Sequence, residues 1–341
     1  MTNANSLDTY RLLGRSGLRV SPLALGTMTF GTDWGWGTDE KEARRIFDTY
    51  VDRGGNFIDT ANQYTGGTSE RFVGTFAAEK REQLVLATKY TLPLRPKDPN
   101  AGGNHRKSMV RSVEQSLQRL KTDYIDLLYL HAWDAVTPVE EILRAMDDLV
   151  RAGKLLYVGI SDAPAWQVAR MQVIADLRGW SPLVALQIEY SLIERTVERE
   201  LIPMAQEMGL GVIPWSPLGS GVAEASGTRK NIAAAQGALN EKGLAVAGVV
   251  KDVAAEIGKT LAQVALAWTL LNPTVTAPIL GARTIAQLED NLGALDVTLS
   301  EDQRTRLEAA SAIVLGFPHD MLSRPLTRAV MFGEVKIAAR V

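Results

Sequence analysis

The chain has 341 residues, and its 37 lysines and arginines face 39 acidic residues, which gives a net charge of −2. This balance supplies no excess of basic residues of the kind that nucleic-acid binding needs, so we expect no nucleic-acid partner. The sequence has no cysteine, which excludes disulfides, thiolate nucleophiles and cysteine-ligated metals. Its three histidines lie far apart and match no metal-binding motif, so we expect no metal site.

No stretch of the sequence approaches 18 uninterrupted apolar residues, and the first ten residues are polar rather than apolar. We therefore expect a cytoplasmic protein with no membrane partner. The hydrophobic share of 46% is ordinary for a globular protein and sufficient for a large core. The length by itself fits either two domains or one large α/β barrel.

Eight short apolar runs alternate with amphipathic stretches between residues 23 and 292. The runs lie at residues 23–26, 56–59, 84–89, 124–131, 155–160, 184–187, 211–215 and 276–281. Between them, apolar residues recur with helical spacing, as they do from Ala43 to Val51. Strands that alternate with helices are typical of a parallel sheet, and eight such units are what a closed (β/α)₈ TIM barrel requires. The predicted fold class is therefore α/β, a TIM barrel.

The barrel is predicted to take up residues 23–292 of a single domain that spans residues 1–341. Residues 10–21 are expected to form a hairpin that plugs the bottom of the barrel, and residues 293–341 a C-terminal extension with extra helices. A doubly wound nucleotide-binding sheet would carry a G-x-G-x-x-G fingerprint after its first strand. Gly35-Trp36-Gly37 does not continue into that pattern, and no phosphate-binding P-loop occurs.

Two helix starts carry sequence signals. Thr137 is expected to cap a helix whose first residue is Pro138, with Glu140 completing a capping box. Asp39 and Glu42 are expected to do the same for the first helix of the barrel.

Four polar residues stand at or just after the ends of the second, third and fourth predicted strands: Asp59, Tyr64, Lys89 and His131. In TIM barrels the active site lies at the carboxyl ends of the strands. Taken singly, Asp59 could close its own turn, Tyr64 could be an ordinary loop side chain and His131 a satisfied core group. Lys89 needs a partner at the mouth of a barrel, and Asp59 could be that partner. Together the four predict an active site.

Several motifs resemble those of the aldo-keto reductase superfamily, over roughly residues 11–308. They are F-I-D-T-A-x-x-Y at 57–64, A-T-K at 87–89, L-L-Y-L-H at 127–131, L-G-T-M at 25–28, G-I-S at 159–161, W-S-P-L at 215–218 and G-A-R at 281–283. Among its subgroups, the chain looks most like bacterial reductases related to the potassium-channel β-subunits.

The resemblance implies hydride transfer between NAD(P)H and an aldehyde or ketone. Tyr64 would be the general acid that gives its proton to the forming alkoxide, and Lys89 would lower the pKa of Tyr64. Asp59 would keep Lys89 charged, and His131 would orient the carbonyl.

The resemblance also implies a set of cofactor-binding residues. These are Gly26, Thr27, Met28, Asp59, Ser161, Asp162, Gln187, Trp215, Ser216, Pro217, Leu218, Gly219, Gly221, Gly281, Arg283, Gln287 and Asn291. Arg283 precedes a helix start that Thr284 is expected to cap, with Gln287 at its third position, and a guanidinium beside a helix start makes an anion site. A 2′-phosphate fits there, so NADP(H) is preferred and NAD(H) is the alternative.

The sequence departs from the family pattern at two places. Asp162 stands where the family commonly has asparagine, so it could accept from the nicotinamide carboxamide or, alternatively, cap the helix that Ala163 and Pro164 begin. The loop after Leu218 continues with Gly219 and Gly221 instead of the usual Leu-Thr-Gly run, which leaves open how it covers the cofactor.

Trp34, Trp36, Tyr90 and Trp133 follow the first, third and fourth strands and could wall a substrate pocket or simply pack in loops. The expected partner is a small carbonyl or alcohol, and the sequence leaves a homo-oligomer open. Two other functions stay open. One is an aldolase in which Lys89 forms a Schiff base, and the other is a cofactor-holding, redox-sensing subunit of a partner protein.

Overall fold

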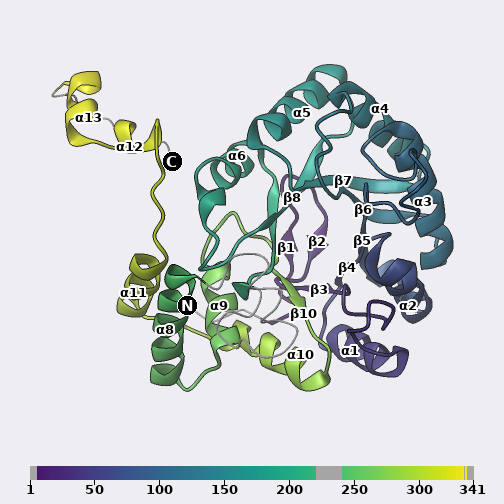
Figure 1. The fold of residues 1–341 in the computed structure, drawn as a ribbon, viewed down its shortest axis with the longest axis horizontal. Coiled ribbons are helices and arrows are strands. Elements are labelled where there is room, and N and C mark those ends of the chain that lie inside the picture. The colour runs from purple at the N-terminus through teal and green to yellow at the C-terminus, as the bar shows by residue number, and fades with distance from the viewer. Residues whose placement is uncertain (1–5, 220–239, 334, 336–341) are drawn as a thin grey trace.

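A nearly closed barrel of eight parallel strands forms the centre of the protein in this computed structural model, which describes residues 6–219, 240–333 and 335 (Figure 1). The strands are β3 (Ala24–Gly26), β4 (Phe57–Asp59), β5 (Val85–Tyr90), β6 (Ile125–Leu130), β7 (Leu155–Ser161), β8 (Leu183–Glu189), β9 (Gly211–Trp215) and β10 (Ile279–Gly281). They follow the order β10-β3-β4-β5-β6-β7-β8-β9, and a parallel bridge between Val212 and Val275 spans the remaining gap. The TIM-barrel prediction is confirmed.

Helices surround the barrel, and two more extend away from it at the C-terminal end (Figure 1). The helices are α1 (Glu40–Asp52), α2 (Thr68–Ala77), α3 (Arg106–Leu120), α4 (Val139–Arg151), α5 (Ala165–Arg178), α6 (Leu201–Met208), α8 (Glu241–Ile257), α9 (Leu261–Leu270), α10 (Ile285–Leu292), α11 (Glu301–Ser311), α12 (His319–Leu322) and α13 (Pro325–Phe332). Short 3₁₀ turns are η1 (Tyr64–Gly67), η2 (Arg81–Gln83), η3 (Thr196–Glu198) and η5 (Gly293–Asp296). Within the described residues, no helix is long and apolar enough to cross a membrane.

The predicted hairpin is present and closes the lower end of the barrel. Its strands are β1 (Arg11–Leu12) and β2 (Arg19–Val20). Leu13 and Val20 pack with the residues that line the inside of the barrel, so the hairpin supplies part of the interior core. Gly14 has a φ of +54°, and an added Cβ there would lie 2.3 Å from the carbonyl oxygen of Val184. Only glycine fits this close approach.

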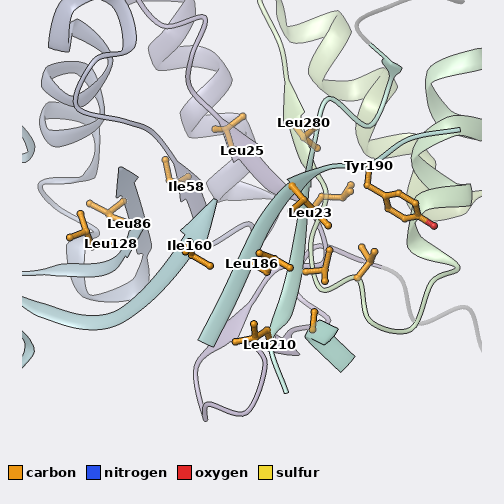
Figure 2. Packing of buried hydrophobic residues seen from close by; sticks show 14 of the residues in the cluster. Leu23, Leu25, Ile58, Leu86, Leu128, Ile160, Leu186, Tyr190, Leu210 and Leu280 are labelled. Carbon is orange, nitrogen blue, oxygen red and sulfur yellow. The ribbon is translucent and has the colours of Figure 1, made fainter. Parts of the chain in front are cut away.

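The strands alternate between two hydrophobic layers. Outward-facing residues such as Leu25, Ile58, Leu86, Leu128 and Ile160 pack against the helices (Figure 2). The residues between them, including Phe57, Ala87, Leu127 and Tyr129, fill the inside of the barrel. Because side chains alternate with a period of two, the polar residues that continue the inward series at the carboxyl ends must point into the mouth of the barrel.

Most strand predictions are correct to within two residues, and the eighth is the exception. β10 begins at Ile279, three residues later than expected, because Pro278 has no N–H to donate to a neighbouring strand. Thr276 instead donates its backbone N–H to the carbonyl oxygen of Val212, which helps to close the barrel.

The helix-start predictions are correct in part. The Asp39 side chain caps α1 by accepting from the backbone N–H of Glu42. The carboxylate of Glu42, however, accepts from the backbone N–H of Ile285 and completes no capping box. Thr137 is not the cap of α4, because its hydroxyl donates to Asp134 and the helix starts at Val139 after Pro138.

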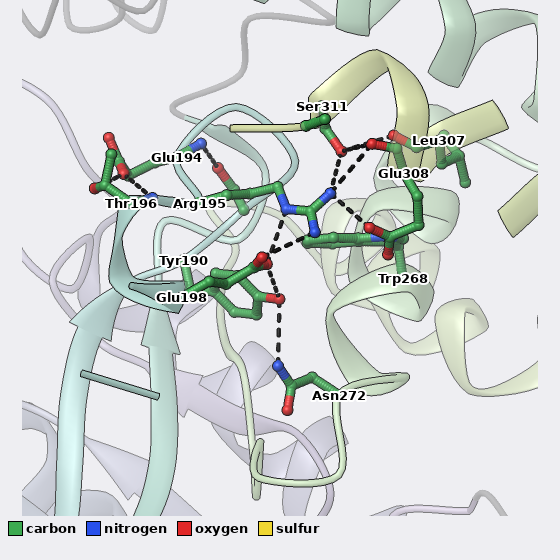
Figure 3. A network of polar contacts seen from close by, with 12 residues as sticks. Tyr190, Glu194, Arg195, Thr196, Glu198, Trp268, Asn272, Leu307, Glu308 and Ser311 are labelled. Carbon is green, nitrogen blue, oxygen red and sulfur yellow. Dashed lines mark hydrogen bonds and ion pairs between the residues drawn. The ribbon is translucent and has the colours of Figure 1, made fainter. Parts of the chain in front are cut away.

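A polar network fixes α11 to the barrel (Figure 3). The Arg195 guanidinium pairs with Glu198 beside it and with Glu308 of α11, at 2.8 and 2.6 Å. It also lies over the ring of Trp268 in α9, whose indole N–H donates to Glu308. The Arg195 guanidinium therefore joins the loop after β8 to the outer helices α9 and α11.

Candidate active site

Three strand ends and one turn bring Asp59, Tyr64, Lys89 and His131 together. The buried Lys89 Nζ donates to Asp59 Oδ1 at 2.5 Å, to the Thr60 carbonyl oxygen at 2.9 Å and to the Tyr64 hydroxyl at 3.3 Å. The imidazole ring of His131 meets the Tyr64 ring edge to face, with 5.9 Å between ring centroids. An acid, an ammonium, a phenol and an imidazole thus form one contact network.

The sequence around Tyr64 turns its ring back over the mouth of the barrel. Thr65, Gly66 and Gly67 all have positive φ angles, of 48°, 63° and 89°, which reverse the chain within η1. The hydroxyl of Thr65 donates to the Phe30 carbonyl oxygen at 2.7 Å and holds the turn in place.

The pKa shifts leave the proton on Tyr64 and the positive charge on Lys89. Burial alone would lower the pKa of Lys89, but Asp59 and Tyr64 together outweigh burial, so the pKa rises. Burial raises the pKa of Tyr64, and the Lys89 ammonium offsets only part of that rise. Lys89 therefore lowers the pKa of Tyr64, as expected, but desolvation is the larger effect and the net pKa lies above its ordinary value.

His131 is a neutral imidazole at physiological pH. Burial, aided by the Lys89 charge, lowers its pKa to about 3. Its Nδ1 is buried with no hydrogen-bond partner in the described part of the chain. An unpaired buried N–H is rarer than an unpaired acceptor, so we assign the proton to Nε2, where it can be donated to a ligand.

A cavity of about 520 Å³ opens above this network. The predicted site residues that line it are Gly26, Met28, Asp59, Tyr64, His131, Ser161, Asp162, Gln187, Trp215, Ser216, Pro217, Leu218, Gly281 and Arg283, together with Trp34 and Trp36. Its size is that of a small-molecule site.

Other predicted residues do not line the cavity. Lys89 lies beneath it, bonded to Asp59 and Tyr64, and Thr27 is buried with its hydroxyl donated to the Asp59 carbonyl oxygen. Gly219, Gln287 and Asn291 also lie outside the lining, and Gly221 lies outside the described residues.

Two of the four aromatic residues expected to wall the pocket do not line the cavity. Tyr90 follows the inward-facing Lys89, so it points outward, is fully buried and donates its hydroxyl to the Asn104 carbonyl oxygen. Trp133 packs against the outer hydrophobic layer. The pocket-wall prediction therefore fails for both residues.

The cavity also has walls that the sequence analysis missed. They are Thr29, Gln63, Leu92, Leu266, Ile279, Leu280 and Ala282. Gln63 and Thr29 directly adjoin motif residues and could have been found from that proximity. Leu266 belongs to α9, which carries no sequence signal for a site.

The side of the mouth formed by β7, β8 and β9 has polar atoms that suit a carboxamide. The Ser161 hydroxyl oxygen is buried and makes no hydrogen bond of ordinary geometry to the described residues. Gln187 donates its amide N–H to Asp59 Oδ2 at 2.9 Å, which leaves its carbonyl oxygen for a donor. A donor and an acceptor side by side fit the nicotinamide amide.

Asp162 does not cap a helix. α5 begins at Ala165 after Pro164 and has no side-chain cap. Instead, Asp162 Oδ1 accepts from the indole N–H of Trp215 at 3.0 Å, a pairing across 53 residues of sequence.

Arg283 marks the other end of the cavity. Thr284 caps α10 by accepting from the Gln287 N–H, as predicted, and Gln287 Oε1 accepts from the Arg283 N–H. Within the described residues the Arg283 guanidinium makes no ion pair or hydrogen bond. The cation and the helix start therefore suit a phosphate, although Glu42 already occupies one N–H of the helix.

Comparison with known sequences agrees with this geometry. The profile of the Aldo/keto reductase family matches residues 22–312, which is most of the chain. The chain belongs to this family of oxidoreductases.

Curated relatives give the match more detail. The chain is 38% identical over 327 residues to norsolorinic acid reductase of Aspergillus flavus, covering 93% of this chain and 84% of the relative. It is 42% identical to an oxidoreductase of Bacillus subtilis, covering 86% and 93%, and 37% identical to aryl-alcohol dehydrogenase [NADP(+)] of Phanerodontia chrysosporium, covering 89% and 86%.

Proposed function

We propose that this protein is an NADP(H)-dependent reductase that converts aldehydes or ketones to alcohols. The observation that carries the proposal is the bonded set of Asp59, Lys89 and Tyr64, with His131 beside it, at the mouth of a cavity of about 520 Å³. The cofactor, when bound, supplies the hydride.

The chain's own residues provide the proton and the alignment. Tyr64 donates its phenolic proton to the alkoxide oxygen as that oxygen gains charge. Lys89 stabilises the phenolate left behind, and Asp59 holds Lys89 in place. The neutral His131 donates from Nε2 to the carbonyl oxygen, which orients the substrate and stabilises the developing charge.

Arg283 supports NADP(H) over NAD(H). A guanidinium with no partner among the described residues, next to the capped start of α10, suits the 2′-phosphate that only NADP(H) carries. One relative is named for NADP(+), which agrees with this preference. Ser161 and Gln187 would hold the nicotinamide amide, and Trp215 would stack on its ring.

Aromatic walls favour a carbonyl attached to an apolar or aromatic group. Trp34 and Trp36 line the cavity with their ring centroids 5.6 Å apart, and Trp34 also meets the ring of Tyr64. Met28 and Leu92 extend this apolar surface. The name of the aryl-alcohol dehydrogenase relative points to aromatic substrates as well.

The alternative functions receive less support. A Schiff-base aldolase needs a neutral lysine, whereas the pKa of Lys89 is raised by Asp59 and Tyr64. The redox-sensing subunit, and with it the finer resemblance to the potassium-channel β-subunits, remains a prediction that no feature of the described residues favours.

Steady-state NADPH oxidation with a panel of aromatic, aliphatic and sugar aldehydes tests the proposal. We expect turnover with the panel and the highest kcat/KM for aromatic aldehydes. Tight NADPH binding without turnover of any carbonyl would instead support the redox-sensing subunit. Trapping of a lysine adduct by borohydride would support the aldolase.

A further inference from the structure

The cavity carries one carboxylate that no salt bridge balances. Within the described residues, the charged side chains that line it are Asp59, Asp162 and Arg283. Asp59 is paired with Lys89, and the lowered pKa of His131 leaves that ring neutral. Arg283 follows β10, three strands around the barrel from Asp162 at the end of β7. Burial raises the pKa of Asp162, and the Trp215 indole N–H and the Lys89 charge offset part of that rise. In its ionised form Asp162 makes this end of the cavity negative.

The position of Asp162 is fixed through both its backbone and its side chain. It directly follows Ser161, the last residue of β7, and has a φ of 45°, a conformation that aspartate tolerates better than most residues. Its carboxylate accepts from the Trp215 indole N–H at 3.0 Å. Asp162, Trp215, Ser161 and Gln187 all line the same wall, which is where the proposed function places the nicotinamide.

We propose that Asp162 makes this site bind the oxidised cofactor more tightly, relative to the reduced one, than a neutral residue there would. The proposal rests on the proposed function. The oxidised nicotinamide ring carries a positive charge and the reduced ring is neutral, so a fixed carboxylate attracts only the former.

The consequence concerns the direction of the reaction. The overall exchange is alcohol + NADP⁺ ⇌ carbonyl + NADPH + H⁺, in which the alcohol carbon loses a hydride and its hydroxyl loses a proton through Tyr64. Tighter binding of NADP⁺ shifts the equilibrium between the two enzyme-bound pairs, NADPH with carbonyl and NADP⁺ with alcohol, toward NADP⁺ and alcohol. Carbonyl reduction therefore becomes more favourable on the enzyme. Asp162 thus tunes the bound equilibrium without touching the proton donor.

The experiment compares affinities for NADP⁺ and NADPH, measured by quenching of tryptophan fluorescence, in the full chain and in Asp162→Asn. Asparagine keeps an oxygen that can accept from Trp215, so the substitution removes the charge and preserves the contact. We expect NADP⁺ to bind more weakly, so that the ratio Kd(NADPH)/Kd(NADP⁺) falls about tenfold, equivalent to about 1.4 kcal/mol.

Two controls separate charge from shape. Glu207, an exposed residue of α6, does not line the cavity, so Glu207→Gln should change the ratio less than twofold. Trp215→Phe removes the indole donor and keeps the carboxylate, so both affinities should fall while the ratio stays within about threefold. Because both cofactors carry the same phosphates, effects on the phosphate end cancel in the ratio.

Equal changes of both affinities in Asp162→Asn would overturn the proposal, and so would a tenfold loss of the ratio in Trp215→Phe. Either result would make Asp162 a support for the indole ring. If the unmodified chain binds neither NADP⁺ nor NADPH, the proposed function itself fails, which is a different outcome from either of these.

Discussion

The two sides of the barrel mouth are built in opposite ways. On the side of β4, β5 and β6, Lys89 donates to Asp59, Thr60 and Tyr64, and its side chain is fully buried. On the side of β7 to β10, the Ser161 hydroxyl and the Arg283 guanidinium make no hydrogen bond to the described residues. On the first side Asp59, Lys89 and Tyr64 bond to one another, and His131 is the member whose Nδ1 has no partner in the described residues. On the second side, Ser161 and Arg283 present their polar groups to the cavity.

In the proposed function, this difference separates the reacting groups from the binding groups. A proton donor must hold its geometry before the substrate arrives, and the buried salt bridge of Lys89 and Asp59 provides that rigidity. Unpaired donors and acceptors cost stability in the free protein but give a ligand its affinity. Substitutions on the first side should therefore change kcat and stability, and those on the second side should change Kd.

The largest effect is expected from Tyr64→Phe, which removes the proton donor and keeps the ring against His131 and Trp34. We expect kcat for aldehyde reduction to fall roughly 10²- to 10⁴-fold, with the Kd for NADPH nearly unchanged. Tyr124→Phe, outside the cavity, is the matched control and should retain full activity. Unchanged kcat in Tyr64→Phe, with chemistry shown to be rate-limiting, would remove Tyr64 from its role.

Lys89→Met should lower the free energy of unfolding by about 3–5 kcal/mol, because it leaves the Asp59 carboxylate buried without its partner. The double variant Asp59→Asn/Lys89→Met removes both charges and should unfold at a higher urea concentration than Lys89→Met alone. If the two variants were equally stable, the pair would not be an electrostatic unit.

Arg283→Ala acts on the binding side and should weaken NADPH by about 10- to 150-fold, or roughly 1.5–3 kcal/mol, while NADH scarcely changes. The control Arg304→Ala, an exposed arginine of α11, should leave both affinities as they are. An equal loss for NADPH and NADH would place the 2′-phosphate elsewhere.

His131 should make the folded protein sensitive to acid. Its pKa is about 3 in the folded state and ordinarily 6.5, so the unfolded chain binds the extra proton between these values and stability falls as pH drops below 6.5. Between pH 7 and pH 5 the free energy of unfolding, measured with urea, should fall by about 2 kcal/mol more in the unmodified protein than in His131→Asn. Parallel losses would mean that His131 is not neutral when folded.

The sequence predicts the barrel well because each strand is a local apolar run between amphipathic helices. The sequence also predicts that the four candidate catalytic residues lie together, since strand ends meet at one edge of a parallel barrel. The alternation along β5 could have shown that Tyr90 points away from the cavity. The contact of Asp162 with Trp215 and the wall supplied by Leu266 depend on how distant elements pack, which no local pattern records. The predicted Thr137 cap of α4 is absent because the Thr137 hydroxyl donates to Asp134 instead.

Transfer of deuterium from [4,4-²H₂]NADPH to an aromatic aldehyde, followed by mass spectrometry of the alcohol, tests the central claim most directly. The account predicts one deuterium on the carbinol carbon with the unmodified chain, and loss of that product in Tyr64→Phe while the variant still binds NADPH. A protein that binds NADPH and forms an alcohol without deuterium at that carbon would contradict the account.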